Sequence, residues 1–309
     1  MTRKLRTLLI AVSLTATLTG WAGETKPSAV VSPDIPRKVK FADQTVDLDR
    51  TDMYERLDRE LTAMMYTHGN TLLTIKRANR YFPVMAPILK ANGVPLDLLY
   101  LACIESNLNP RALSGARAAG FWQFMPATAR EYGLEVSDYV DQRYDPELST
   151  EAACRYLKNA YAKYGNWESA AASYNGGMGR VSRELESQLA TTAYDLYLTE
   201  ETSRYMFRLL AMKMIMEHPA KYGYHLRVDQ LYQPMEFETV EVSEPVEDWP
   251  KWAADHGISF LQLREANPWI RAKSLPNEEG KTYRVRIPTE KSLYRSTGKR
   301  SVYNAQWIK

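Results

Sequence analysis

The sequence predicts a mainly α-helical protein with a small α+β module near its C-terminus. Between residues 51 and 222, apolar residues recur at helical spacing, and short loops rich in Gly or Pro separate the helical segments. No long alternating run interrupts this part of the chain. After residue 235, two alternating segments, 237–242 and 282–288, flank two short helical segments, 248–256 and 259–266. A strand–helix–helix–strand order in about fifty residues indicates a separate module.

The first 22 residues have the features of a signal peptide. Arg3, Lys4 and Arg6 precede an apolar run from Leu8 to Leu18, and Gly20-Trp21-Ala22 supplies small residues for cleavage. The run is too short to span a bilayer, and no Cys lies near it to carry a lipid anchor. We expect a protein exported to the periplasm or cell envelope. An uncleaved N-terminal anchor is the alternative.

Composition argues against a nucleic-acid-binding protein. The chain of 309 residues is 45% hydrophobic and 25% charged, which is typical of globular domains, and its formal charge is +3. Removing residues 1–22 also removes three basic side chains and no acidic ones. The mature chain is then almost neutral, so we expect no nucleic-acid partner.

Changes in pattern divide the rest of the chain into four parts. Residues 23–50 lack a clear period and are expected to form a linker or N-terminal arm. Residues 51–235 form the main helical domain, and its most informative segments lie within 95–210. Residues 236–290 form the small module, and residues 291–309 form a basic C-terminal tail that is expected to be frayed or lightly docked.

Helix signals then place the elements of the main domain. Asp52 is a candidate cap for the first helix, Ser149 or Thr150 for a later one, and Pro83 and Pro87 are expected to interrupt the third segment. The expected helical segments are 52–65, 71–80, 82–91, 96–106, 126–133, 150–161, 167–173 and 201–217.

Glu105 is predicted to lie in surroundings that disfavour a negative charge. Glu105 lies near the C-terminal end of the segment 96–106, which is apolar on every helical face and begins after Pro95. Both burial and the helix dipole disfavour a negative charge there, so we expect the pKa of Glu105 to be raised. A protonated carboxyl group in an apolar pocket is what cleavage of a glycosidic bond needs as its general acid.

Other polar groups suit a sugar ligand. Gln123 lies in the aromatic segment Gly120–Pro126, and Tyr174 and Asn175 end a helix at two glycines. Amide, hydroxyl and aromatic groups recognise neutral N-acetylated sugars. Each segment also has a purely structural explanation, as core or as a helix stop.

No metal or cofactor is predicted. Four scattered His and two distant Cys give no zinc-binding spacing. Cys103 and Cys154 lie in apolar helical contexts, and we favour two free buried thiols over a disulfide, which an exported protein would also allow.

Taken together, the motifs resemble a known family. They are Glu105-Ser106, Ser114 with its following Gly and Ala, Gly120-Phe-Trp-Gln-Phe-Met-Pro-Ala-Thr-Ala129 and Ala172-Ser-Tyr-Asn-Gly-Gly177. This set resembles the goose-lysozyme-like lytic transglycosylases, also called the SLT domain class. The segments Asp141–Pro146, Ser149–Ala153 and Glu201–Tyr205 resemble the branch of membrane-bound lytic murein transglycosylase D. Phe121 stands where the family usually has Leu, and Gln142 where Glu is commoner.

The resemblance implies a lysozyme-like fold and a reaction on peptidoglycan strands. Glu105 would be the single acid/base that cleaves the bond between N-acetylmuramic acid and N-acetylglucosamine, leaving a 1,6-anhydro end. The groove would be lined by Ser114, Gln123, Met125, Tyr174, Asn175 and Tyr205. No metal or cofactor is implied. Two alternatives remain, a hydrolase of the goose-lysozyme kind and a wall-binding scaffold without turnover.

The C-terminal module resembles a degenerate LysM domain. The resemblance rests on Thr239–Val242, Trp252–Ser259, Leu263–Pro268 and Tyr283–Pro288. The family's Gly-Asp-Thr after the first strand is replaced by Ser243-Glu244-Pro245, which puts glycan binding by this module in question. Its tryptophans, Trp249, Trp252 and Trp269, either form a small core or offer a sugar-binding face, and we favour the core.

Overall fold

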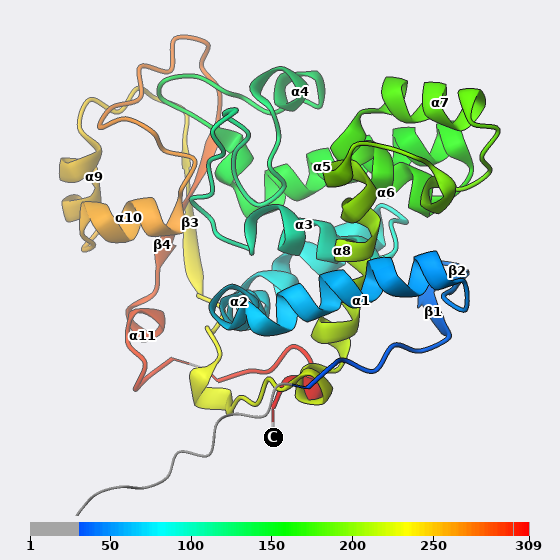
Figure 1. Ribbon diagram of the computed structural model, residues 1–309. Coiled ribbons are helices and arrows are strands. Elements are labelled where there is room, and N and C mark those ends of the chain that lie inside the picture. The colour runs from blue at the N-terminus through cyan, green and yellow to red at the C-terminus, as the bar shows by residue number, and fades with distance from the viewer. Residues whose placement is uncertain (1–30, 299, 309) are drawn as a thin grey trace, which may run out of the picture. The chain divides into compact units, whose positions relative to one another are not determined.

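Helix α3 (Leu99–Ser106), the segment that contains Glu105, packs against α2 (His68–Ala91) and α8 (Glu200–Glu217) in the main domain (Figure 1). The computed structural model describes residues 31–298 and 300–308, so the expected signal peptide lies outside the described residues. Residues 33–309 cluster as one unit. Within the described residues, none of the helices combines the length and the apolar character needed to cross a bilayer.

The region expected to be a linker contains a β-hairpin. Strands β1 (Lys38–Phe41) and β2 (Gln44–Asp47) pair antiparallel, with Phe41 opposite Gln44. Phe41 and Leu48 are buried in the core of the main domain. The turn is fixed from outside, because the backbone N–H of Ala42 donates to Asp97 Oδ2 at 2.6 Å. Strands of four residues are too short for alternation to reveal them, and distant contacts supply their stability.

The first two helices lie close together in sequence. Helix α1 (Thr51–Tyr66) packs on α8, and α2 follows after one residue. The two segments expected at 71–80 and 82–91 are one continuous helix, with Pro83 and Pro87 inside it. Each proline removes one backbone hydrogen bond. Burial of the apolar face of α2, including Phe82, Met85 and Leu89, offsets this cost.

The remaining helices of the main domain follow α3 and its loop in sequence. They are α4 (Pro126–Glu131), α5 (Pro146–Tyr164), α6 (Trp167–Gly176), α7 (Met178–Ser187) and α8. The cap of α5 is Asp145, whose carboxylate accepts from the N–H groups of Glu147 and Leu148 at 2.9 Å. The candidate caps Ser149 and Thr150 lie inside the first turn, where their hydroxyls donate to backbone carbonyls four residues earlier.

The C-terminal module has the predicted order of elements. Strands β3 (Phe237–Val242) and β4 (Tyr283–Pro288) pair antiparallel, with Val240 opposite Val285. Helices α9 (Trp249–Asp255) and α10 (Phe260–Ala266) lie between them in sequence, and α10 packs on β4 (Figure 1). Trp249 and Trp269 belong to the buried core of the module, as expected, whereas Trp252 is partly buried and stacks on His256. The predicted mainly α fold with a small α+β module is confirmed.

The C-terminal tail is packed rather than loose. After the short helix α11 (Glu290–Leu293), the chain returns to the main domain. Trp307 is 2% exposed, lies in the main-domain core and donates its indole N–H to the carbonyl of Met216 at 2.6 Å. The sequence predicts a frayed or lightly docked tail, but the buried ring of Trp307 and its hydrogen bond to Met216 hold the segment in place.

Candidate active site

Glu105 lies on the last turn of α3, which ends when Asn107 adopts a left-handed conformation with φ 50°. The side chain is partly buried, and its Oε1 accepts a hydrogen bond from the Tyr205 hydroxyl at 2.6 Å. Burial raises the pKa of Glu105 to about 6, while the hydrogen bond from Tyr205 and the charge of Arg208 act in the opposite direction. The predicted upward shift is therefore found, and burial is its main cause.

Helix α8 supplies the groups that face Glu105. Tyr205 is 2% exposed, and burial beside the Glu105 carboxylate raises its own pKa well above the usual range, so it stays a hydrogen-bond donor. Arg208, one turn further along α8, donates to the carbonyl of Ile104 at 3.3 Å. A cavity of about 310 Å³ beside α8 is lined by Glu200, Glu201, Arg204 and Arg208.

Arg208 was missed by the sequence analysis. It belongs to no motif that was considered, and an arginine on a helix is usually a solvated side chain. The signal that could have found it is its spacing, because residues three apart share a helix face and Tyr205 was already a candidate.

The loop after α3 is tied to the C-terminal end of that helix. Ser106, the residue that follows Glu105, donates its hydroxyl to the carbonyl of Phe121 at 2.8 Å. Ser114 closes a turn of the same loop, since its Oγ accepts from the Ala118 N–H at 3.0 Å. Gln123 has φ 48° and donates its side-chain amide to the carbonyl of Gly120 at 2.8 Å. Ser114 and Gln123 thus shape the loop.

Tyr174 connects this loop to α6. Its hydroxyl donates to the carbonyl of Trp122 at 2.9 Å, and its ring contacts the rings of Trp122, Phe124 and Tyr156 edge-on. Nearby Glu105 contributes to raising the pKa of Tyr174 well above its usual range, although burial is the larger cause.

The six candidate groove residues therefore separate by position. Tyr205 bonds Glu105 directly, and Tyr174 lies within electrostatic range of it. Asn175 follows Tyr174 and is partly buried, and Met125 is 43% exposed at the start of α4. Within the described residues, no hydrogen bond joins Asn175, Met125 or Ser114 to Glu105. Their contact with a glycan stays a prediction.

The buried ion pair between Arg143 and Asp141 supports the loop that follows α3. Arg143 and Asp141 are 5% and 6% exposed, and two guanidinium nitrogens bond the carboxylate at 2.9 and 2.7 Å. The remaining nitrogen of Arg143 donates to the carbonyls of Arg117 and Phe124 at 2.7 and 2.9 Å. Gly120 lies so close that a Cβ there would overlap the carbonyl of Arg143. The motif around Asp141 therefore positions the loop.

No second carboxylate is hydrogen-bonded to Glu105 among residues 31–298 and 300–308. Asp97, an acid near it in sequence, accepts from Lys213 Nζ at 2.9 Å and from the Ala42 N–H. Glu201 is exposed, and its charge raises the pKa of Glu105 less than burial does. Within the described part of the chain, no group of three His, Cys, Asp or Glu could hold a metal ion. Cys103 and Cys154 are free and buried, as favoured.

Comparison with protein families gives the class of this chain. The Transglycosylase SLT domain matches residues 85–196, and the Soluble lytic transglycosylase C-terminal LysM-like domain matches residues 238–291. The chain thus contains an SLT transglycosylase domain followed by a LysM-like domain, and the resemblance stated from its motifs is confirmed.

Individual relatives are similar over different parts of the chain. Membrane-bound lytic murein transglycosylase D of Escherichia coli K12 is 33% identical over 72% of this chain, which spans 48% of that protein. Peptidoglycan transglycosylase gp16 of Escherichia phage T7 is 39% identical over 39% of this chain and 9% of its own length. Among solved structures, the 70 kDa soluble lytic transglycosylase of Escherichia coli is 22% identical, with a TM-score of 0.41, over 54% of this chain and 30% of its own.

Proposed function

We propose that this protein is a peptidoglycan lytic transglycosylase with Glu105 as its single general acid and base. The observation that supports this most is the environment of Glu105, a partly buried carboxyl group with its pKa raised to about 6 and a tyrosine hydroxyl on one oxygen. Such a group holds a proton in mildly acidic to near-neutral conditions, as an acid catalyst must. The SLT domain match and the murein transglycosylase relative support the same substrate class.

In the proposed reaction the carboxyl group of Glu105 acts twice, first as an acid and then as a base. Glu105 first donates it to the glycosidic oxygen between N-acetylmuramic acid and N-acetylglucosamine, and the bond from that oxygen to the anomeric carbon breaks. The N-acetyl group of the muramoyl residue assists at the anomeric carbon. The Glu105 carboxylate then takes the proton of the C6 hydroxyl, whose oxygen bonds the anomeric carbon. No water is consumed, and a 1,6-anhydro end remains.

The surroundings of two described acids, Asp97 and Glu201, favour this route over two-carboxylate hydrolysis. A second acid positioned as nucleophile or as base for water is the usual arrangement in glycosidases. The nearby acid Asp97 is engaged by Lys213, and Glu201 lies in solvent. Tyr205 bonds Oε1 of Glu105, whereas Oε2 has no hydrogen-bond partner among the described residues and is free to face the substrate.

Digestion of purified murein tests the proposal. Wild-type protein is expected to release muropeptides with 1,6-anhydromuramoyl ends, identified by mass spectrometry, and Glu105→Gln is expected to release none. Reducing ends instead would show a goose-lysozyme-like hydrolase. A wild-type protein that binds murein without releasing any fragment would show a wall-binding scaffold.

The site of action and the role of the module follow from the substrate. We propose that the protein acts at the cell wall in the envelope, with peptidoglycan strands as its partner. The LysM-like module has buried Trp249 and Trp269, so glycan binding through these two rings is not part of the proposal.

A further inference from the structure

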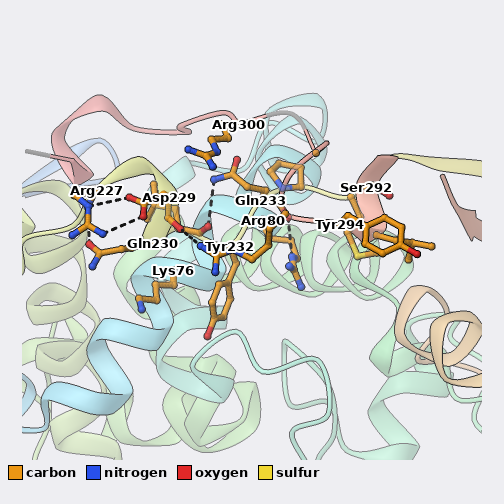
Figure 2. Close-up of a pocket in the computed structure, with 16 residues that line it drawn as sticks. Lys76, Arg80, Arg227, Asp229, Gln230, Tyr232, Gln233, Ser292, Tyr294 and Arg300 are labelled. Carbon is orange, nitrogen blue, oxygen red and sulfur yellow. Dashed lines mark hydrogen bonds and ion pairs between the residues drawn. The ribbon is translucent and has the colours of Figure 1, made fainter. Parts of the chain in front are cut away.

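A second cavity lies away from Glu105. It has a volume of about 620 Å³ and is formed by α2, the segment 227–235 and the segment 292–300, whose described residues include Arg295 and Arg300 (Figure 2). Neither Tyr205, Arg208 nor Glu201, the groups that act on Glu105, lines this cavity. Its size is in the range of small-molecule sites.

The cavity has an excess of positive charge. Five cationic side chains line it, against one carboxylate: Lys76, Arg80, Arg227, Arg295 and Arg300 against Asp229. Arg227 is paired with Asp229, at 3.1 Å from Nε to Oδ1. The other four form no ion pair with a carboxylate in the described part of the chain. Cations gathered around one space repel one another, and an anionic ligand would relieve that repulsion.

Backbone contacts hold part of this charge in place. Arg80 Nε donates to the carbonyl of Gln233 at 2.9 Å, and its guanidinium lies 5.6 Å from the centre of the Tyr232 ring. Arg295 donates to the carbonyl of Asp229 at 3.3 Å. These carbonyls fix each arginine without neutralising it, so the remaining N–H groups stay available to a ligand.

The ligand that fits is a compact, multiply charged oxyanion. A carboxylate offers a single charge, whereas a phosphate monoester offers about −1.5 to −2 charges and three acceptor oxygens at neutral pH. Phosphate therefore matches a cavity lined by several cations better. Tyr232 and Tyr294 are 37% and 60% exposed at the rim, where their rings could contact the body of the ligand.

We propose that this cavity is a binding site for a phosphate ester, independent of the reaction at Glu105. The ester is either a soluble sugar phosphate or the phosphate of a lipid head group. The relevant variant is Lys76→Gln/Arg300→Gln, which removes two unpaired cations on opposite segments of the wall. The matched control, Lys90→Gln/Lys273→Gln, removes two exposed lysines that do not line the cavity.

Calorimetric titration at low ionic strength with glucosamine 1-phosphate and inorganic phosphate measures the soluble source. Sedimentation with vesicles that contain phosphatidic acid, whose head group is a phosphate monoester, against pure phosphatidylcholine vesicles, measures the lipid source. Binding to either source supports the proposal if the cavity variant loses about tenfold or more in affinity while the control variant stays within about twofold of wild type. Murein digestion by both variants is expected to match wild type.

Four outcomes would overturn the proposal. The first is that none of the phosphate probes binds the wild-type protein. The second is an equal loss of affinity in the two double variants, which would mean general surface charge. The third is binding of citrate as tight as that of the phosphate ester, which would mean a carboxylate site. A change in murein digestion without a change in phosphate binding would also refute it, while leaving the proposed function standing.

Discussion

The hydrogen bond from Tyr205 to Glu105 makes a prediction about pH dependence. In Tyr205→Phe the carboxylate of Glu105 loses a donor at 2.6 Å, while the aromatic ring keeps its place in the core. A hydrogen bond to a charged group contributes about 1.5–3 kcal/mol. Since one pKa unit corresponds to about 1.36 kcal/mol, the pKa of Glu105 should rise by about one to two units from its value of about 6.

The sign of the effect follows from the role of the acid. In the proposed mechanism the free enzyme carries a protonated Glu105, so kcat/KM is expected to fall as pH rises through the pKa of this group. Tyr205→Phe should therefore keep its activity up to a pH about one to two units higher than wild type. The assay is the initial rate of soluble muropeptide release from murein at low substrate concentration across pH.

A matched variant separates this effect from general damage. In Tyr174→Phe the lost hydroxyl bonds the carbonyl of Trp122 and not Glu105, so the alkaline limb should stay near that of wild type. An alkaline limb of Tyr205→Phe that is unmoved or shifted to lower pH would refute the argument that Tyr205 stabilises the carboxylate.

Three further predictions concern stability. Because the pKa of Glu105 is about 6 folded and 4.5 in its ordinary state, its protonation contributes stability that is complete below about pH 4.5 and is lost as pH rises through about 6. Glu105→Gln, which should be inactive yet folded, should therefore gain about 2 kcal/mol relative to wild type between about pH 4 and about pH 7, measured by urea unfolding. Gly120→Ala should lower the melting temperature and the activity more than Gly165→Ala, since both have positive φ but only Gly120 meets a backbone carbonyl. Arg286→Leu should cost about 3–5 kcal/mol, because it leaves the buried carboxylate of Asp145 without its ion-pair partner.

Each of these three stability predictions has its own control or its own contrary result. Equal pH dependence of unfolding in wild type and Glu105→Gln would exclude a raised pKa. Equal losses in the two glycine variants would mean that backbone conformation alone matters, at about 1–2 kcal/mol. For Arg286, the control is Arg284→Leu, whose side chain is 69% exposed and lies 3.9 Å from Glu147. A loss in that control as large as in Arg286→Leu would contradict the argument from burial.

The hydrophobic periodicity of the sequence predicted the elements whose structure depends mainly on their own residues. Helix α8 and the two strands of the module were located within one or two residues, because their periodicity extends over whole elements. The raised pKa of Glu105 was predictable for the same reason, since an apolar helix implies burial around its only acid near that end.

The errors have a common physical cause, which is stabilisation by distant residues. The β1–β2 hairpin is fixed by Asp97, fifty-five residues from Ala42 in sequence. Helix α2 continues through two prolines because its apolar face is buried by other helices. The cap of α5 is Asp145 rather than Ser149, since the helix includes Pro146 as its first residue. The role of Arg143 in supporting the loop depends on carbonyls up to 26 residues away.

Two segments far apart in sequence complete one hydrophobic cluster. Phe41 lies in the first hairpin and Trp307 in the C-terminal tail, and both are buried in the same cluster as α3. Contacts between such distant residues require long stretches of chain to close into loops, which slows their formation. We expect this cluster to be completed late in folding, after the local helical contacts have formed.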